Sequence, residues 1–294
     1  MTTADRRSTR ERGKAERTAA SGRRTLVLAA LLGMAGVAGL AGALVSEWGP
    51  PATGTPAYGN RAPLSAFLRQ EDNVPYDGRF TFVRIRFRPA GTGRCFGGGQ
   101  RGDPSWQHDY PYAEQHLMEI MSGITYLEPY QGGGNILWTD DEELFRYPLA
   151  YVSEPGCWTM GEDEVQGLRN YLLKGGFLIF DDFRGRDWFN FRDQILRVLP
   201  DANLVELDAS HEIFHSFFDI DQRVLDSTGQ GWSWPRYYGV FEDNDPTKRL
   251  MMIVNYDNDI GDYWEWSGSG YLPIDLTNDA YKLGVNYILY AMTH

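Results

Sequence analysis

Alternating and periodic apolar positions divide the chain from residue 80 onward into strands and helices. Residues 80–87, FTFVRIRF, alternate apolar with polar side chains, which predicts a strand with one wet face at an edge of a sheet. Shorter apolar runs predict further strands at 135–138, 149–152, 177–180 and 204–207. Helical periodicity predicts helices at 112–124, about 161–174 and about 186–199, and a helical turn at 142–145. This order predicts an α/β fold, a mostly parallel sheet with helices on both faces.

The pattern changes after residue 208. Residues 238–241 and 249–256 are apolar runs joined by the acidic turn 242–248, which predicts a β-hairpin. A final apolar stripe predicts a closing helix at about 279–291.

The amino-terminal part has the pattern of a membrane or export segment. Residues 25–46 contain no charged side chain and are long enough to cross a bilayer as a helix. The basic tail 1–24 places its own side in the cytoplasm, so we expect a single-pass cell-membrane protein with its carboxyl-terminal domain outside. An exported protein with a cleaved signal is the alternative, because residues 41–43, Ala-Gly-Ala, form a small-residue cleavage site. Residues 47–78, rich in Pro and Gly, are predicted to be a linker to a domain at 79–294.

The distribution of charge argues against nucleic acid as a partner, and the cysteine content limits the possible thiol chemistry. Residues 1–24 carry a net charge of +5 within an overall charge of −12, so the remainder carries −17. Such an acidic body is a poor partner for nucleic acid. The two cysteines, Cys95 and Cys157, leave a disulfide open, and Cys157 after the third predicted strand is a weak candidate nucleophile.

The sequence KGGFLIFDDFRG, residues 174–185, contains the first candidate site. An acidic pair, Asp181 and Asp182, ends a predicted buried strand and is followed by Arg184. Ligands of such sheets bind beyond the carboxyl ends of the strands, so these three side chains are predicted to bind a ligand. Either carboxylate could bind a cation or act as a general base, whereas the lack of Cys or Ser argues against covalent acyl chemistry.

Two further groups of side chains are candidate metal ligands. His211 and His215 lie in HEIFH, which matches the HExxH string of zinc proteases, although the sequence around them favours a short turn with structural hydrogen bonds. His211 joins Asp181 and Asp182 as a catalytic candidate, and both histidines join Asp182 as candidates for metal binding. His211 and His215 are also predicted to bind the ligand together with Asp181, Asp182 and Arg184. A weaker calcium-type loop contains Asp257, Asp259 and Asp262.

Several blocks together resemble the bacterial DUF4159 family over roughly residues 79–293. They are FTFVRIRF, WTDDEELFRYPLAYV, EDEVQGLRNYLLKGGFLIFDDFRG, HEIFHSFFDI and DAYKLGVNYILYAMTH. The resemblance implies a flavodoxin-like fold of the class I glutamine amidotransferase type, similar to ThuA-like domains. In those relatives the nucleophilic cysteine lies at the turn that is Asp181, Asp182 and Phe183 in this chain. The family's gene neighbourhoods imply partners of two kinds, MoxR-type ATPases and von Willebrand factor A domain proteins.

From these patterns we expect a membrane-anchored, exported amidotransferase-like domain that binds a ligand or a partner protein at the cell envelope. The sequence favours a binding protein over an enzyme and argues against a glutamine amidotransferase, because the nucleophile is absent. The alternative is a metal-dependent hydrolase that uses Asp181 or Asp182 with His211 or His215. No cofactor is specified beyond a divalent metal.

Overall fold

A computed structural model describes residues 73–90, 104–229 and 234–294. The predicted tail, the membrane or signal segment, most of the linker and Cys95 lie outside these residues. Within the described ranges, no helix combines the length and apolar character that crossing a membrane requires.

The fold is a mixed α/β structure with a mostly parallel sheet, as predicted, and the sheet has seven strands. Its strands follow the order β3-β1-β4-β6-β9-β8-β7. The first five are parallel, and β8 is antiparallel to both of its neighbours. The strands span Asn135–Leu137 (β3), Val83–Ile85 (β1), Leu149–Ser153 (β4), Phe177–Phe183 (β6), Leu250–Tyr256 (β9), Arg236–Phe241 (β8) and Val205–Leu207 (β7). The five parallel strands therefore have the order 2-1-3-4-5 of a flavodoxin-like sheet.

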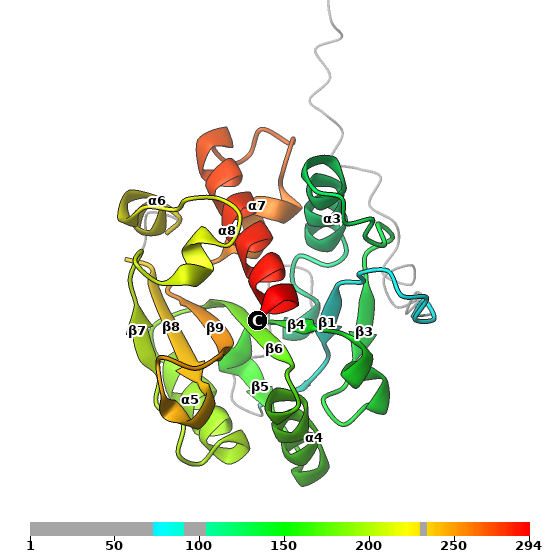
Figure 1. Ribbon diagram of the computed structural model, residues 1–294, viewed down its shortest axis with the longest axis vertical. Helices are drawn as coiled ribbons and strands as arrows, with labels where there is room; N and C mark the ends of the chain where they lie inside the picture. The colour runs from blue at the N-terminus through cyan, green and yellow to red at the C-terminus, as the bar shows by residue number, and fades with distance from the viewer. Residues whose placement is uncertain (1–72, 91–103, 230–233) are drawn as a thin grey trace, which may run out of the picture. The chain divides into compact units, whose positions relative to one another are not determined.

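Helices cover both faces of the sheet (Figure 1). One face packs against α3 (Tyr112–Ile124), α7 (Ile260–Glu265) and α8 (Ile274–Thr293). The other packs against α4 (Glu162–Leu173) and α5 (Asp187–Val198). Each face has its own apolar core because successive strand residues point to opposite sides. The closing helix, α8, is longer at both ends than the predicted 279–291.

The first strand differs from its prediction. β1 contains three residues and lies between β3 and β4, so the prediction of an edge strand was wrong. The misleading residue is Arg84, whose polar side chain suggested a wet face but is only 1% exposed. Its guanidinium is ion-paired with Glu114 of α3, so a charged position lies inside the core.

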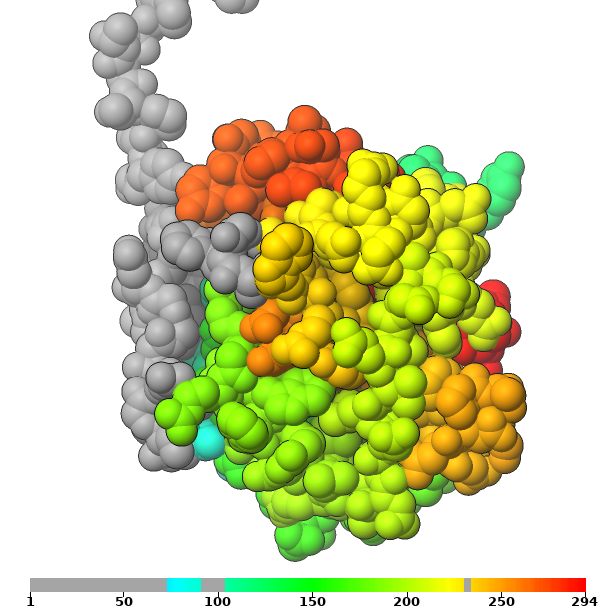
Figure 2. Space-filling view, turned by 90° about the vertical axis from the view of Figure 1, so that its left-hand side faces the viewer, coloured from blue at the N-terminus to red at the C-terminus, as the bar shows by residue number. Residues whose placement is uncertain are grey.

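Short elements complete the structure at the margins. β2 (Arg88–Pro89) pairs with β5 (Trp158–Thr159) in a separate two-stranded sheet. The predicted hairpin is confirmed as the antiparallel pair β8 and β9. The face of the molecule shown in Figure 2 is formed largely by α5 and by the segment from β7 to α6 (Gln222–Ser227). The described residues also contain short 3₁₀ helices, the last of them in the hairpin turn: η2 (Ser105–Gln107), η3 (Glu142–Arg146), η4 (Pro155–Cys157), η5 (Glu212–His215) and η6 (Glu242–Asn244).

The first described residues are tied to the sheet. Asn73, in the predicted linker, exchanges two side-chain hydrogen bonds of 2.8 Å with the backbone of Ile136 in β3.

Cys157 is disulfide-bonded, which removes it as a candidate nucleophile. The other cysteine of the sequence, Cys95, lies outside the described residues.

Breaking the buried ion pair should destabilise the domain strongly. In Glu114→Gln the Arg84 charge would stay buried without its counter-ion, so we expect a loss of about 3 kcal/mol in the free energy of unfolding. Urea unfolding of the full-length chain in detergent, followed by tryptophan fluorescence, measures this loss. Glu119→Gln, at an exposed position of the same helix, is the control. Equal effects of the two substitutions would contradict the role assigned to the pair.

Candidate functional site

The site lies at the carboxyl ends of the parallel strands, and the acidic pair of β6 is at its centre. β6 continues through Asp181 and Asp182 to Phe183, so the pair lies inside the strand rather than after it. The register between β6 and β9 shifts between Phe180 and Phe183, and Asp182 has a left-handed φ of 57°. The chain therefore turns within the pair, and the two carboxylates meet different partners.

Asp181 is held by fixed hydrogen bonds. Its Oδ2 accepts from the Tyr151 hydroxyl and from the backbone N–H of Gly261, each at 2.9 Å. Its Oδ1 accepts from the Asn255 amide at 3.2 Å. These bonds join β4, β6, β9 and α7, so Asp181 is an anchor of the site rather than an open ligand.

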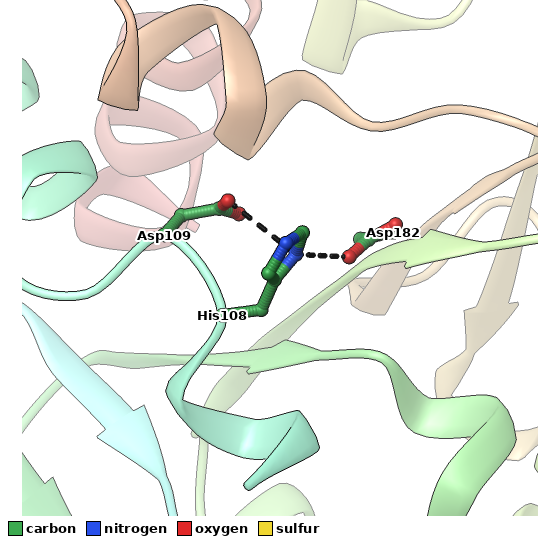
Figure 3. Close-up of side chains that lie close together, drawn as sticks. All are labelled: His108, Asp109 and Asp182. Atoms are coloured by element: carbon green, nitrogen blue, oxygen red, sulfur yellow. Dashed lines mark hydrogen bonds and ion pairs between the residues drawn. The ribbon is translucent and has the colours of Figure 1, made fainter. Parts of the chain in front are cut away.

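Asp182 forms an ion pair with a histidine from a distant part of the sequence. Its Oδ2 lies 2.6 Å from Nδ1 of His108, which also lies 3.4 Å from Oδ1 of Asp109 (Figure 3). Its Oδ1 accepts a hydrogen bond of 3.2 Å from the half-exposed Arg184. His108 and Asp109 come from the segment between η2 and α3, and the Arg84 guanidinium fixes that segment by donating to the backbone oxygens of Trp106 and His108.

A second acidic group lies beside this pair. Oxygens of Asp109, Asp259 and Asp262 lie within 4.8 Å of one another. Asp259 caps α7 by accepting from the Asp262 N–H at 3.1 Å, and its other oxygen lies 3.6 Å from Arg184. Asp109 is only 4% exposed, and neither of its carboxylate oxygens has a hydrogen-bond partner among the described residues.

Backbone strain is concentrated at the same edge. Asp109, Glu154, Asp182 and Asp257 all have left-handed φ angles between 47° and 67°, and all follow or end a strand or lie in the site loop. Such a conformation costs a non-glycine residue about 1 kcal/mol or more and commonly accompanies function. The strain therefore supports this edge as the functional one.

The pKa of His108 is governed by its acidic neighbours. Burial alone would lower the pKa of this imidazole, but the hydrogen bond to Asp182 and the charges of Asp109, Asp182 and Glu154 raise it to about 11. Burial would likewise raise the pKa of Asp182, yet His108 and Arg184 hold it below its usual value. The two groups therefore form a charged pair at neutral pH.

Four further carboxyls of the site, those of Asp109, Asp259, Glu154 and Asp181, have raised pKa values. Burial, followed by neighbouring carboxylate charges, raises the pKa of Asp109 and of Asp259 well above the ordinary range. Burial and the charge of Asp182 raise the pKa of Glu154 to about 7 and, against opposing hydrogen bonds, that of Asp181 to about 6. The raised pKa values show that the site holds more acidic groups than His108 and Arg184 can neutralise.

The two predicted histidines of HEIFH do not join the aspartates. His211 caps η5, where its Nδ1 accepts from the Ile213 N–H, and its ring packs against Phe241 and Tyr290. Phe241 pairs with Leu250 at the start of β9, which is the opposite end of the sheet from Asp181. His215 donates to the Ala209 carbonyl at 2.6 Å and lies 3.3 Å from Asp219. The string therefore forms a single short turn with local bonds.

The predicted calcium-type loop is divided. Asp259 and Asp262 belong to the acidic group, whereas Asp257 accepts from the Gly185 N–H at 3.1 Å and lies 4.0 Å from Arg236. Asp257 thereby ties the end of β9 to the end of β6.

Sequence reasoning missed His108, Asp109 and Glu154. Their signal is positional, because the loops after the first and third strands of a 2-1-3-4-5 sheet border the crevice where ligands bind. Glu154 directly follows β4, and the His-Asp pair ends the long loop after β1. A search for acidic and histidine side chains in those two loops could have identified all three.

The arrangement suits cation binding better than nucleophilic catalysis. The described part of the site offers carboxylates and one histidine, and Asp182 stands at the strained position of β6. Oxygen-rich groups of this kind bind hard divalent cations such as Mg²⁺, Mn²⁺ and Ca²⁺. Two groups could hold an ion: His108, Asp109 and Asp182, or Asp109, Asp259 and Asp262.

Comparison with known proteins identifies the relatives of this chain at the level of a family. A family model described as a domain of unknown function, DUF4159, matches residues 96–292, a range that contains every residue of the site. No curated protein matches the chain.

Removal of the Glu154 charge should change how stability depends on pH. A carboxyl whose pKa is raised on folding contributes stability below its unfolded value near 4.5, and this contribution is lost as the pH rises through about 7. Between pH 4.5 and pH 8 the free energy of unfolding should therefore fall less in Glu154→Gln than in the wild type. We expect the two decreases to differ by about 1 to 3 kcal/mol. Urea unfolding in EDTA at the two pH values tests this. Exposed Glu128→Gln is the control, and an unchanged difference in Glu154→Gln would contradict the assignment.

Proposed function

The chain belongs to the DUF4159 family, and we propose that it is a membrane-anchored, exported domain that binds a cationic ligand at the carboxyl edge of its sheet. The ligand is a free cation or a basic group of a partner protein at the cell envelope. In this proposal the domain has an amidotransferase-like fold but does not process amides.

The excess of buried acidic groups over basic groups is the observation that carries the proposal. Five aspartates stand at the site against His108 and Arg184, and four of the five are at most 6% exposed. The five are Asp109, Asp181, Asp182, Asp259 and Asp262, and Glu154 lies beside them. Burying a carboxylate without a counter-charge is costly, so a bound cation would stabilise the folded state.

The fold and the strained aspartate support the loss of amidotransferase chemistry. The strand order 2-1-3-4-5 fits a flavodoxin-like sheet, in which ligands bind at the carboxyl edge. Asp182, with its left-handed φ, lies near the end of the strand where the related amidotransferases are expected to carry cysteine. The Asp182 side chain is a carboxylate that is paired with His108 and Arg184. It can attract a positively charged ligand, but it cannot form the thioester that a cysteine would form with an acyl group.

The cellular setting follows from the sequence outside the described residues. The uncharged segment 25–46 and the basic residues before it favour a membrane anchor with the domain outside the cytoplasm. MoxR-type ATPases and von Willebrand factor A domain proteins remain the partners that the family resemblance suggests.

A cationic ligand should stabilise the domain through Asp182. We expect at least one cation from a panel of Mg²⁺, Mn²⁺, Ca²⁺, putrescine, spermidine and arginine amide to raise the melting temperature of the full-length chain in detergent. A ligand at a hundred times its Kd adds about 2.7 kcal/mol, which corresponds to a shift of several degrees. Asp182→Asn should reduce the shift.

The control for this experiment is Asp243→Asn, which removes an exposed carboxylate from the acidic turn of the hairpin. It should shift as the wild type does. If no cation stabilises the wild type, or if all three proteins respond equally, the proposed binding function is wrong.

The membrane topology can be measured separately. We expect the full-length chain to fractionate with membranes, and a protease added outside spheroplasts to digest the carboxyl-terminal domain. Release of the domain as a shorter soluble product would support the cleaved signal instead. Protection from protease in intact spheroplasts, with digestion only after lysis, would contradict export.

A further inference from the structure

We propose that Asp109, Asp259 and Asp262 form the binding site of one hard divalent cation of the Mg²⁺, Mn²⁺ or Ca²⁺ class. This inference rests on the proposed function and names its ligand. It assigns the role of metal ligand to Asp109, which lies far from the other two residues in the sequence.

The first observation that supports this site is the burial of the Asp109 carboxylate without hydrogen bonds. It is 4% exposed, and both of its oxygens are buried without a hydrogen-bond partner among the described residues. A buried carboxylate normally accepts several hydrogen bonds, and leaving its oxygens unsatisfied costs several kcal/mol. Oδ1 of Asp109 lies 3.4 Å from Nδ1 of His108, but that nitrogen is already paired with Asp182 at 2.6 Å, so the two buried oxygens of Asp109 can accept a further positive partner.

The spacing of the three side chains fits a single ion. Their ligand oxygens all lie within 4.8 Å of one another. Oxygen ligands lie about 2.1 Å from Mg²⁺ and about 2.3 to 2.6 Å from Ca²⁺, so two ligands on opposite sides of one ion are about 4 to 5 Å apart. One ion can thus contact all three carboxylates without a large movement of the chain.

The backbone around the site holds these oxygens in place. Asp109 lies in the loop shortly before α3, its carbonyl accepts from the Ala113 N–H at 3.0 Å, and its φ is 67°. Asp259 is fixed as the cap of α7. Gly261 leaves the space that Asp109 needs, because a Cβ there would lie 2.4 Å from Oδ2 of Asp109.

The neighbouring residues define which ion fits. His108 offers the nearest nitrogen, but its Nδ1 is already 2.6 Å from Asp182, so this second group is closed by its own ion pair. The remaining donors are carboxylate oxygens, which favour hard cations over soft ones such as Cu(I). Arg184, at 3.6 Å from Asp259, offsets part of the charge and leaves room for one divalent ion rather than two.

Binding of Mn²⁺ to the full-length chain in detergent tests the site directly. Bound Mn²⁺ loses its sharp six-line spectrum in electron paramagnetic resonance, so titration yields both stoichiometry and Kd. We expect about one Mn²⁺ per chain, displaced by Mg²⁺ or Ca²⁺, and an affinity at least about tenfold weaker in Asp109→Asn, since a charged ligand is lost. Asp243→Asn, which removes a surface carboxylate, should bind as the wild type does.

Two measurements keep the test decisive. Unfolding of Asp109→Asn in EDTA should show a folded protein at least as stable as the wild type, because the substitution removes a buried charge. If that variant does not fold, Asp262→Asn, at a less buried position, takes its place with the same expected loss of affinity.

The outcomes separate this inference from the proposed function. Absence of Mn²⁺ binding to the wild type, or equal affinity in the wild type and the Asp109 and Asp262 variants, overturns the metal site. If putrescine, spermidine or arginine amide still stabilises the wild type through Asp182, cation binding stands and only the metal assignment fails. If no cation of either kind stabilises it, both are wrong.

Discussion

The buried guanidinium of Arg84 is the interaction on which the rest of the structure depends. It lies in β1, pairs with Glu114 of α3 and stacks 4.9 Å from the centre of the Tyr151 ring in β4. It also donates to the backbone oxygens of Trp106 and His108. One side chain therefore joins two strands, a helix and the loop that contains the site, and a neutral residue could not hold those carbonyls and that carboxylate together.

The ion pair changes the pKa values of both Arg84 and Glu114. Burial would lower the pKa of its guanidinium, but the charges of Glu114, Tyr151 and Asp109 raise it, so the group stays charged. Burial raises the pKa of Glu114 despite the adjacent arginine, which indicates that the pair does not recover the whole desolvation cost. Such a pair contributes less to net stability than to the choice of one geometry, and here that geometry places His108 and Asp109 beside Asp182.

The candidate site shows the opposite balance, because its acidic groups outnumber the basic groups that face them. Asp181 is satisfied by three hydrogen bonds and Asp182 by His108 and Arg184, whereas Asp109 accepts no hydrogen bond among the described residues and only its Oδ1 lies near His108, and Asp259 has only partial compensation. The left-handed backbone at Asp109 and Asp182 adds strain at the same place. A domain that keeps both strain and unpaired charge at the ligand-binding edge of its sheet is arranged to gain stability when something positive binds.

The sequence by itself determined the α/β class, the order of the main elements and the acidic end of β6, because hydrophobic periodicity and turn residues are local properties. It also favoured local hydrogen bonds over zinc binding for His211 and His215. Only the tertiary structure decided that β1 is internal, since an arginine in a strand is expected in water unless a distant glutamate neutralises it. The same holds for the site: Asp109 and Asp259 are 150 residues apart and meet only because parallel strands bring the loops after β1 and β9 to one edge. Long-range convergence of charges leaves no periodic trace along the chain, and for that reason the fold was predictable and the ligand set was not.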